Sequence, residues 1–144
     1  MLISTKGQYA LRLMLDLAVF GNGESVAIKA IAERQSISEK YLEQIVSGLS
    51  RAGYVKSTRG SKGGYKLTKS PEEYTVGDIL RVAEGSIEPV DWDSSDLDTT
   101  DIIESVTNEV WRSLEQSINN VVDNLTLASL VDDYNSRVGF VYMI

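Results

Sequence analysis

Cysteine and histidine are both absent from this sequence of 144 residues. Their absence excludes disulfides, thiolate nucleophiles, ordinary zinc sites and the usual neutral-pH general base. The sequence also lacks an apolar run of about 18 residues and the residue order of a signal peptide. We therefore expect a cytoplasmic protein with no membrane partner. Because no constellation of carboxylates or hydroxyls points to catalysis, we do not expect an enzyme.

Positive charge is scarce in the second half of the chain. Residues 1–75 carry 11 Lys and Arg against 7 Asp and Glu, residues 76–144 carry 3 against 14, and the formal net charge is −7. Between Arg51 and Lys69 there are six cations and no acid. This distribution favours a first half that binds a polyanion such as DNA, attached to an acidic body. Charges that only solvate the surface would give the same pattern, so charge alone leaves both interpretations open.

Two helices are predicted near the N-terminus. Residues 9–20 are apolar nearly all round, as in a buried helix, and are followed by the helix-breaking Gly-Asn-Gly at 21–23. Apolar residues then recur at helical spacing over 25–37. Ser25 is the expected cap of this second helix.

A third helix is expected between its cap, Ser38, and Gly53. The helical period places apolar residues on one face and polar residues on the opposite face. Polar side chains of this size can reach the edges of bases, so the segment resembles the second helix of a helix-turn-helix unit. Any three-helix bundle would show similar periodicity. The polar face carries Lys40, Glu43, Gln44 and Ser47.

The stretch RGSKGGYKL, residues 59–67, places two cations among three glycines. Tyr65 and Leu67 share one face, as in a half-buried strand, and the glycines supply the positive φ that a chain reversal needs. A Walker A phosphate loop is excluded because one glycine and the metal-binding hydroxyl are missing. We predict a β-hairpin directly after the candidate recognition helix, which is the order of a winged helix.

A capped helix and an acidic stretch follow the hairpin. Thr75 and Asp78 have the spacing of a capping box, which predicts a helix that continues through Val82. Seven acids then lie between Glu88 and Glu104. Their order does not match an EF-hand loop, so we expect no metal site there.

Apolar residues from Ile103 to Leu125 recur every three or four positions and predict one long amphipathic helix. Such a helix is about 33 Å long, and a domain this small cannot cover all of its apolar stripe. We expect a symmetric homodimer; the alternative is an intramolecular core helix. A short helix at 126–134 and an apolar tail at 139–144, packed on the body, complete the chain. The predicted dimerisation residues are Val106, Val110, Leu114, Ile118, Val121 and Leu125.

Four motifs resemble the Rrf-two family of winged-helix transcription regulators over almost the whole chain. They are ISTKGQYALRLMLDLA at 3–18, SEKYLEQIVSGLSRAGYVKSTRGSKGGYKL at 38–67, TVGDILRVAEG at 75–85 and TLASL at 126–130. The resemblance implies a mainly α fold (α+β) with a small β-hairpin wing. It divides the chain into a winged helix-turn-helix DNA-binding domain at 1–85 with its wing at 54–69, an acidic loop at 86–103 in the place of the family's cluster-binding loop, and a dimerisation helix with a C-terminal tail at 104–144.

The resemblance also implies a homodimer that binds pseudo-palindromic double-stranded promoter DNA, and we expect this regulator to be a repressor. By this resemblance Ser38, Lys40, Glu43 and Gln44 would lie in the major groove, Arg59, Gly60, Ser61 and Lys62 would form the wing against the minor groove and phosphates, and Lys6 would contact a phosphate. The residue chemistry suits these roles. Gln44 can pair with adenine, Glu43 can accept from cytosine, and Arg59 can enter a narrow groove.

Many members of the family hold an iron-sulfur cluster on three cysteines, the last of them six residues before a Trp. Here Trp111 is present, but Ser105 stands six residues earlier, and Asn108 takes the place of a histidine ligand of some relatives. Without a thiolate a cysteine-held cluster is excluded, and we expect no cofactor. Either the chain belongs to a naturally cluster-free branch, or serine has replaced the cysteines. The first is preferred because serines do not match the ligand spacing throughout.

The sequence leaves more than one kind of regulatory signal open. Resemblance to the cluster-free branch implies control of sulfur and cysteine metabolism, with a cysteine-biosynthetic enzyme as co-repressor on the acidic segment 88–104. A small-molecule effector in the dimer cleft is the main rival. A protein-interaction module that kept the fold and lost DNA binding is a third possibility, which the basic wing disfavours.

Overall fold

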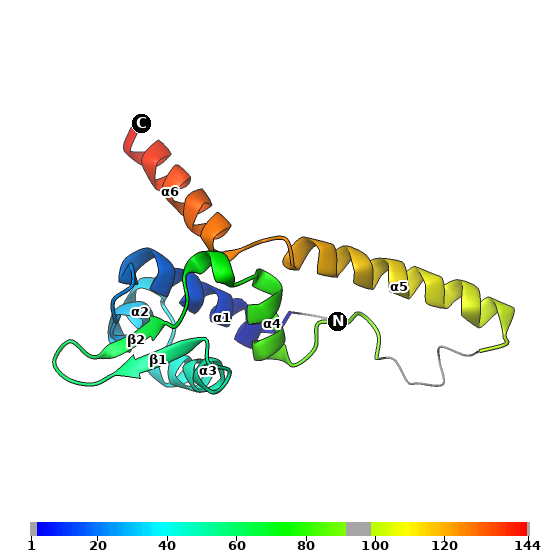
Figure 1. Ribbon diagram of the computed structural model, residues 1–144, viewed down its shortest axis with the longest axis horizontal. Helices are drawn as coiled ribbons and strands as arrows, with labels where there is room; N and C mark the ends of the chain where they lie inside the picture. The colour runs from blue at the N-terminus through cyan, green and yellow to red at the C-terminus, as the bar shows by residue number, and fades with distance from the viewer. Residues whose placement is uncertain (1–2, 92–98, 144) are drawn as a thin grey trace.

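The structure is a computed structural model and describes residues 3–91 and 99–143. The central part of the predicted acidic loop therefore lies outside the described residues. The chain is mainly helical with one antiparallel hairpin (Figure 1), which confirms the predicted fold class. In chain order the elements are α1 (Thr5–Asp16), the π-helical turn η1 (Leu17–Gly21), α2 (Ile28–Gln35), α3 (Glu39–Arg51), β1 (Val55–Thr58), β2 (Gly64–Leu67), the short 3-10 turn η2 (Pro71–Glu73), α4 (Val76–Glu84), α5 (Ile102–Val122) and α6 (Leu127–Met143).

Helix α1 forms the centre of the body, and α2, α3 and α4 pack around it (Figure 1). It begins before the predicted position 9, because the Ser4 side chain accepts a hydrogen bond from the Gly7 N–H and caps it. Ala10, Leu13, Met14 and Leu17 are buried as predicted, whereas Tyr9, Leu11 and Leu15 are only half-buried and Phe20, in the π turn, is exposed. The buried core includes Ala10, Leu13, Met14, Ile31, Leu42, Ile45, Leu49, Val55, Ile79 and Leu127.

The predicted cap of the second helix is wrong. Helix α2 begins at Ile28, and the Ser25 hydroxyl instead donates a 2.7 Å hydrogen bond to Thr58 Oγ1. The adjacent Val26 exchanges backbone hydrogen bonds of 2.8 and 2.9 Å with Tyr65. Val26 thus adds a one-residue bridge to the edge of the hairpin, and this pairing draws Ser25 away from the helix. Gly64 permits the approach, since a Cβ there would overlap the Val26 carbonyl.

The capping box at the start of α4 is confirmed. The Asp78 N–H donates to Thr75 Oγ1 at 3.0 Å, and the Thr75 N–H donates to Asp78 Oδ2 at 3.1 Å. The helix then continues to Glu84, two residues past the predicted Val82. This reciprocal bonding satisfies two helix-terminal donors, which explains why the local sequence sufficed to predict the start.

Helix α5 extends away from the body, but it ends earlier than predicted (Figure 1). It stops at Val122, so Leu125 lies in the connection to α6 rather than on the helical stripe. There the Leu125 carbonyl accepts a 2.8 Å hydrogen bond from the Val76 N–H, and Thr126 pairs with Thr75. The helix ends because this connection forms a short antiparallel bridge to the segment before α4.

The predicted short helix and packed tail at the C-terminus are replaced by one helix, α6. Gly139 does not interrupt it, and Phe140 and Val141 are 65% and 68% exposed. Among the residues of α6 whose burial is described, 127–141, only the first, Leu127, is fully buried in the body. Helix α6 therefore presents apolar surface where a folded-back tail was expected. Among the described helices, none combines the length and apolar character that a membrane span requires.

Candidate nucleic-acid interface

Helix α3 has the two faces that the sequence predicts. Leu42, Ile45, Val46 and Leu49 are buried, while Lys40, Glu43 and Gln44 on the opposite face are exposed. The Ser38 hydroxyl accepts a 3.2 Å hydrogen bond from the Tyr41 N–H, which confirms it as the cap. Gly53, with φ of +78°, follows the last turn.

Lys6, from α1, lies beside this polar face although it is distant in the sequence. Together they form an open hollow of about 550 Å³. Three of the six side chains that line it are cationic, and only Glu43 is acidic. The hollow brings four of the predicted DNA-binding residues together and adds two that were not in the predicted set, Ser47 and Arg51. The lining residues are Lys6, Lys40, Glu43, Gln44, Ser47 and Arg51.

Arg51 is the cation that sequence reasoning missed. Its Nε donates to the Ser47 carbonyl at 3.4 Å, and Arg51 follows Gln44 by seven residues on the same helix. Two helical turns separate such positions, so their side chains share a face. The sequence analysis counted Arg51 only within the basic run from Arg51 to Lys69, whereas the helical period could have placed it on the polar face.

The N-terminus of α1 is fixed in place by Glu84 of α4. Its Oε1 accepts hydrogen bonds of 3.0 Å from the N–H groups of both Ser4 and Gly7. A Cβ at Gly7 would overlap that carboxylate, so only glycine allows this approach. The Tyr9 ring then packs edge-on against Tyr41 of α3 at 5.6 Å. These contacts set the position of Lys6, which lies on the same turn, relative to α3.

The turn that leads into α3 is held by a polar network on α1. Asp16 is 2% exposed and accepts hydrogen bonds of 2.8 Å from both Arg34 and Gln35. The hydrogen bond to Asp16 raises the pKa of Arg34, whose guanidinium also lies 4.2 Å from the centre of the Phe20 ring. Arg12 donates to the Gln35 carbonyl at 2.6 Å. The end of α2 is therefore tied to α1, which limits the orientations that α3 can adopt.

The wing tip carries four more of the predicted DNA-binding residues. Arg59, Gly60, Ser61 and Lys62 are all exposed, and the hairpin projects beyond the body (Figure 1). Gly60 has φ of +107°, a backbone conformation that residues with a side chain rarely adopt, as expected where the chain reverses. A second hollow, of about 640 Å³, lies between the wing and the loop before α2. It is lined by Gly23, Glu24, Ser25, Ala27, Thr58, Ser61, Lys62, Gly63 and Lys66.

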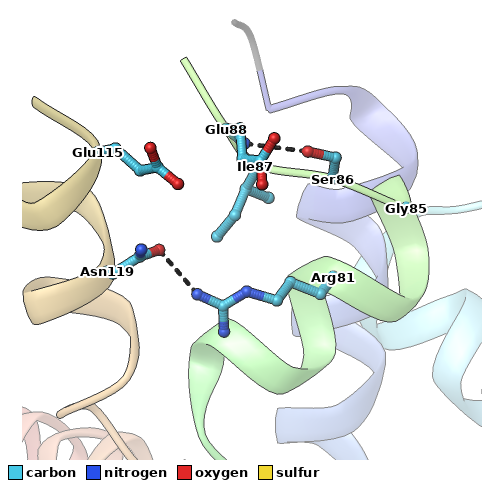
Figure 2. Close-up of a pocket in the computed structure, with 7 residues that line it drawn as sticks. All are labelled: Arg81, Gly85, Ser86, Ile87, Glu88, Glu115 and Asn119. Carbon is cyan, nitrogen blue, oxygen red and sulfur yellow. Dashed lines mark hydrogen bonds between the residues drawn. The ribbon is translucent and has the colours of Figure 1, made fainter. Parts of the chain in front are cut away.

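A cleft of about 270 Å³ between α4 and α5 has different chemistry (Figure 2). Arg81 donates hydrogen bonds to Asp123 at 2.6 Å and to Asn119 at 2.8 Å, and the bond to Asp123 raises the pKa of Arg81. Glu88 and Glu115 also line this cleft. Because the Arg81 charge is already paired with Asp123, these carboxylates make the cleft unsuited to a phosphate.

The predicted dimerisation residues divide into two groups. Val106, Val110, Leu114 and Val121 lie on α5 and are between 46% and 62% exposed. Ile118 is half-buried and packs against the cluster of Val76, Leu80 and Ile87 in its own chain, and Leu125 lies past the helix end. None of the α5 residues, all of them described, is buried within the chain. Their role in dimerisation stays a prediction.

The model of one protein family matches residues 3–133; this family, Rrf2, is described as iron-dependent transcriptional regulators. Protein-bound iron is held by cysteine thiolates in clusters, and by histidine with carboxylates in mononuclear sites. The chain has neither cysteine nor histidine, and Ser105 is exposed on the first turn of α5. Within residues 3–91 and 99–143, no group of three or more acidic side chains could hold a metal ion. The residues present thus do not fit a cysteine-held cluster.

Individual relatives agree with the family match. The chain is 42% identical over 130 residues to the HTH-type transcriptional regulator CymR of Bacillus subtilis (strain 168). The aligned residues cover 90% of this chain and 89% of CymR. The solved structure of CymR, the global cysteine regulator of B. subtilis, superposes with a TM-score of 0.80 at 40% identity, over 92% of this chain and 97% of that one. The solved structure of T. potens IscR superposes with a TM-score of 0.75 at 43% identity, over 93% of this chain and 88% of that one. These relatives are transcription regulators rather than enzymes, as expected, and the chain belongs to the Rrf2 family of transcriptional regulators.

Proposed function

We propose that this regulator is a cytoplasmic homodimeric repressor that recognises promoter DNA without a bound iron-sulfur cluster. The observation that carries the proposal is the hollow where Lys6 of α1 meets the polar face of α3. Its cations can neutralise phosphates, while Gln44 and Glu43 present an amide and a carboxylate that can bond base edges. An α-helix fits the major groove, so α3 is the element that would enter it.

The wing supplies the second contact in this proposal. Arg59 and Lys62 lie at an exposed tip, from which a guanidinium can enter a narrow minor groove and an ammonium can reach a phosphate. Gly60 and Ser61 allow the backbone to approach the sugar-phosphate chain. Ser38 caps α3, so its place at the first turn would put it near the major groove edge.

A second copy of the chain would cover the exposed stripe of α5, which places two recognition helices on one operator. Binding sites about one helical turn apart on DNA suit a two-fold dimer. Each half of the operator would then meet the same set of side chains, and this is why a pseudo-palindromic site is expected.

Control of sulfur and cysteine metabolism is the proposed biological role. It is supported by the similarity to CymR, the global cysteine regulator of B. subtilis, and by the lack of cluster ligands. A cysteine-biosynthetic enzyme is the proposed co-repressor, with a small-molecule effector as the alternative. Adding either purified enzyme or candidate metabolites to the protein-operator complex distinguishes them, since only the true signal changes affinity.

The alternative of a cluster sensor whose cysteines were replaced by serine has a direct test. It requires a cysteine codon at position 105 in the native gene. A serine codon there supports the naturally cluster-free branch.

Fluorescence anisotropy with DNA from the protein's own upstream region tests the main proposal. We expect the unmodified protein to prefer this DNA over a scrambled duplex at fixed salt. Arg59→Ala should weaken binding about tenfold and make the salt dependence less steep, because one counterion-releasing contact is lost. Lys29→Ala, which removes a cation of the exposed α2 surface, is the matched control. Unchanged affinity of Arg59→Ala would contradict the wing contact.

A further inference from the structure

Tyr74 lies between η2 and α4 and is 1% exposed. Its hydroxyl donates a 2.8 Å hydrogen bond to the Tyr54 carbonyl and accepts from the N–H groups of Thr68 and Lys69 at 3.1 and 3.0 Å. A tyrosine hydroxyl has one donor and two acceptor positions, so these three bonds use it fully. The nearby Thr68 hydroxyl, at 3.2 Å, donates its own hydrogen to the Gly53 carbonyl at 2.6 Å.

These three peptide groups are the two ends of the wing. Tyr54 immediately precedes β1, and Thr68 and Lys69 immediately follow β2. One hydroxyl therefore joins both strands of the hairpin at its base. The Tyr54 and Tyr74 rings also pack edge-on at 5.5 Å. A two-stranded hairpin is marginally stable by itself, so its angle depends on such anchoring to the body.

Tyr74 is in turn fixed by the connection between α5 and α6. Its carbonyl accepts a 2.9 Å hydrogen bond from the Leu127 N–H, and the next residue, Thr75, pairs with Thr126. The side chain of Tyr74 thus holds the wing while its backbone is held by the segment that joins the two C-terminal helices.

Because the tip of the wing lies far from its base, a small change of angle at the base displaces the residues that would contact DNA. The five steps along the chain from Tyr54 to Arg59 span roughly 17 Å when extended, so a tilt of about 10° at the base moves the tip by roughly 3 Å. Hydrogen bonds tolerate only a few tenths of an ångström. We infer that Tyr74 is a positioning residue, whose hydroxyl holds the wing at the angle at which Arg59 and Lys62 meet DNA. This inference rests on the proposed function.

Tyr74→Phe tests it, because the change removes only the hydroxyl and keeps the ring and the backbone bonds. We expect the dissociation constant for operator DNA to rise about three- to tenfold. In the background Arg59→Ala plus Lys62→Ala, the same change should have no further effect, since the wing no longer contacts DNA. Tyr134→Phe is the matched control, because that ring packs on Phe20 at 6.0 Å, away from the wing.

The outcomes separate the inference from a general loss of structure. An equal loss in both backgrounds, or no loss in the wild-type background, overturns the inference. If Arg59→Ala plus Lys62→Ala itself binds DNA like wild type, the wing contact of the proposed function fails instead.

A measurement on the wild-type protein avoids any folding defect of the variant. Native-state hydrogen exchange should show the Thr68 and Lys69 amides protected far more than the exposed Lys62 amide at the tip. Exchange of Thr68 and Lys69 as fast as that of Lys62 would overturn the inference.

Discussion

The residues of the α3 hollow differ in the information that they can take from DNA. A lysine ammonium is a point charge that suits any phosphate, whereas the Gln44 amide offers a donor and an acceptor in fixed geometry. In the major groove this pair matches adenine and few other base edges. Substitutions in the hollow should therefore separate affinity from base preference.

Gln44→Ala is expected to relax base preference more than it lowers affinity. Replacement of the base pair that faces Gln44 should cost wild type about 1–3 kcal/mol, and the variant should lose most of that discrimination. Competition anisotropy with a set of operator duplexes, each altered at one position, measures the difference.

Lys6→Ala is the matched control for this measurement. It removes a cation of the same hollow and should weaken binding to every duplex by a similar factor. A Gln44→Ala protein that kept the wild-type preference at all positions would contradict insertion of this helix face into the groove.

At the scale of elements, α5 is unusual because it contributes little to its own chain's core. Its 21 residues extend about 32 Å, and only the end near Ile118 and Val122 packs against α4. Val106, Val110 and Leu114 remain largely open to solvent. An exposed apolar stripe of this length is typical of a subunit interface.

Leu114→Glu should convert the proposed homodimer to a monomer. In a symmetric dimer the substitution would bury one carboxylate in the stripe of each copy. Burial of a carboxylate without a partner charge costs free energy of association. Sedimentation velocity should show a single species near the monomer mass, 15.9 kDa, with unchanged helical content by circular dichroism.

Operator affinity should fall at least tenfold in the same variant, since one half-site contact no longer supports the other. Gln116→Glu adds the same charge at an exposed position of α5 away from the stripe and should remain dimeric. A wild-type protein that sediments as a monomer at micromolar concentration would contradict the assignment of this face.

At the scale of the whole molecule, the donor set distinguishes this protein from iron-dependent members of its family. No side chain in the sequence is a thiolate or an imidazole, because cysteine and histidine are both absent. The redox state of a cysteine-held cluster is therefore not available to this chain as a signal.

Removal of iron should leave DNA binding unchanged. After treatment with a strong chelator and dithionite, we expect the operator dissociation constant to stay within about twofold of the untreated value, and iron analysis to find far less than one atom per chain. A loss of binding that ferrous iron and sulfide restore would contradict the cluster-free assignment.

Local sequence patterns determined much of this protein. The two faces of α3, its Ser38 cap, the Thr75–Asp78 capping box and the hairpin at 55–67 all depend on residues within a few positions of one another. Hydrogen bonds and side-chain periodicity over such short distances have nearly the same consequences in any fold, so the sequence alone predicted them.

Contacts between distant segments decided the rest. Ser25 leaves its expected capping role because Val26 pairs with Tyr65, and α5 ends early because Thr126 pairs with Thr75. The site depends on such contacts too, because Lys6 lies beside α3 only through the packing of α1. Likewise, the Tyr74 hydroxyl forms hydrogen bonds with both ends of the wing. A one-dimensional pattern carries no record of which distant backbone groups will meet, since that depends on how the whole core packs.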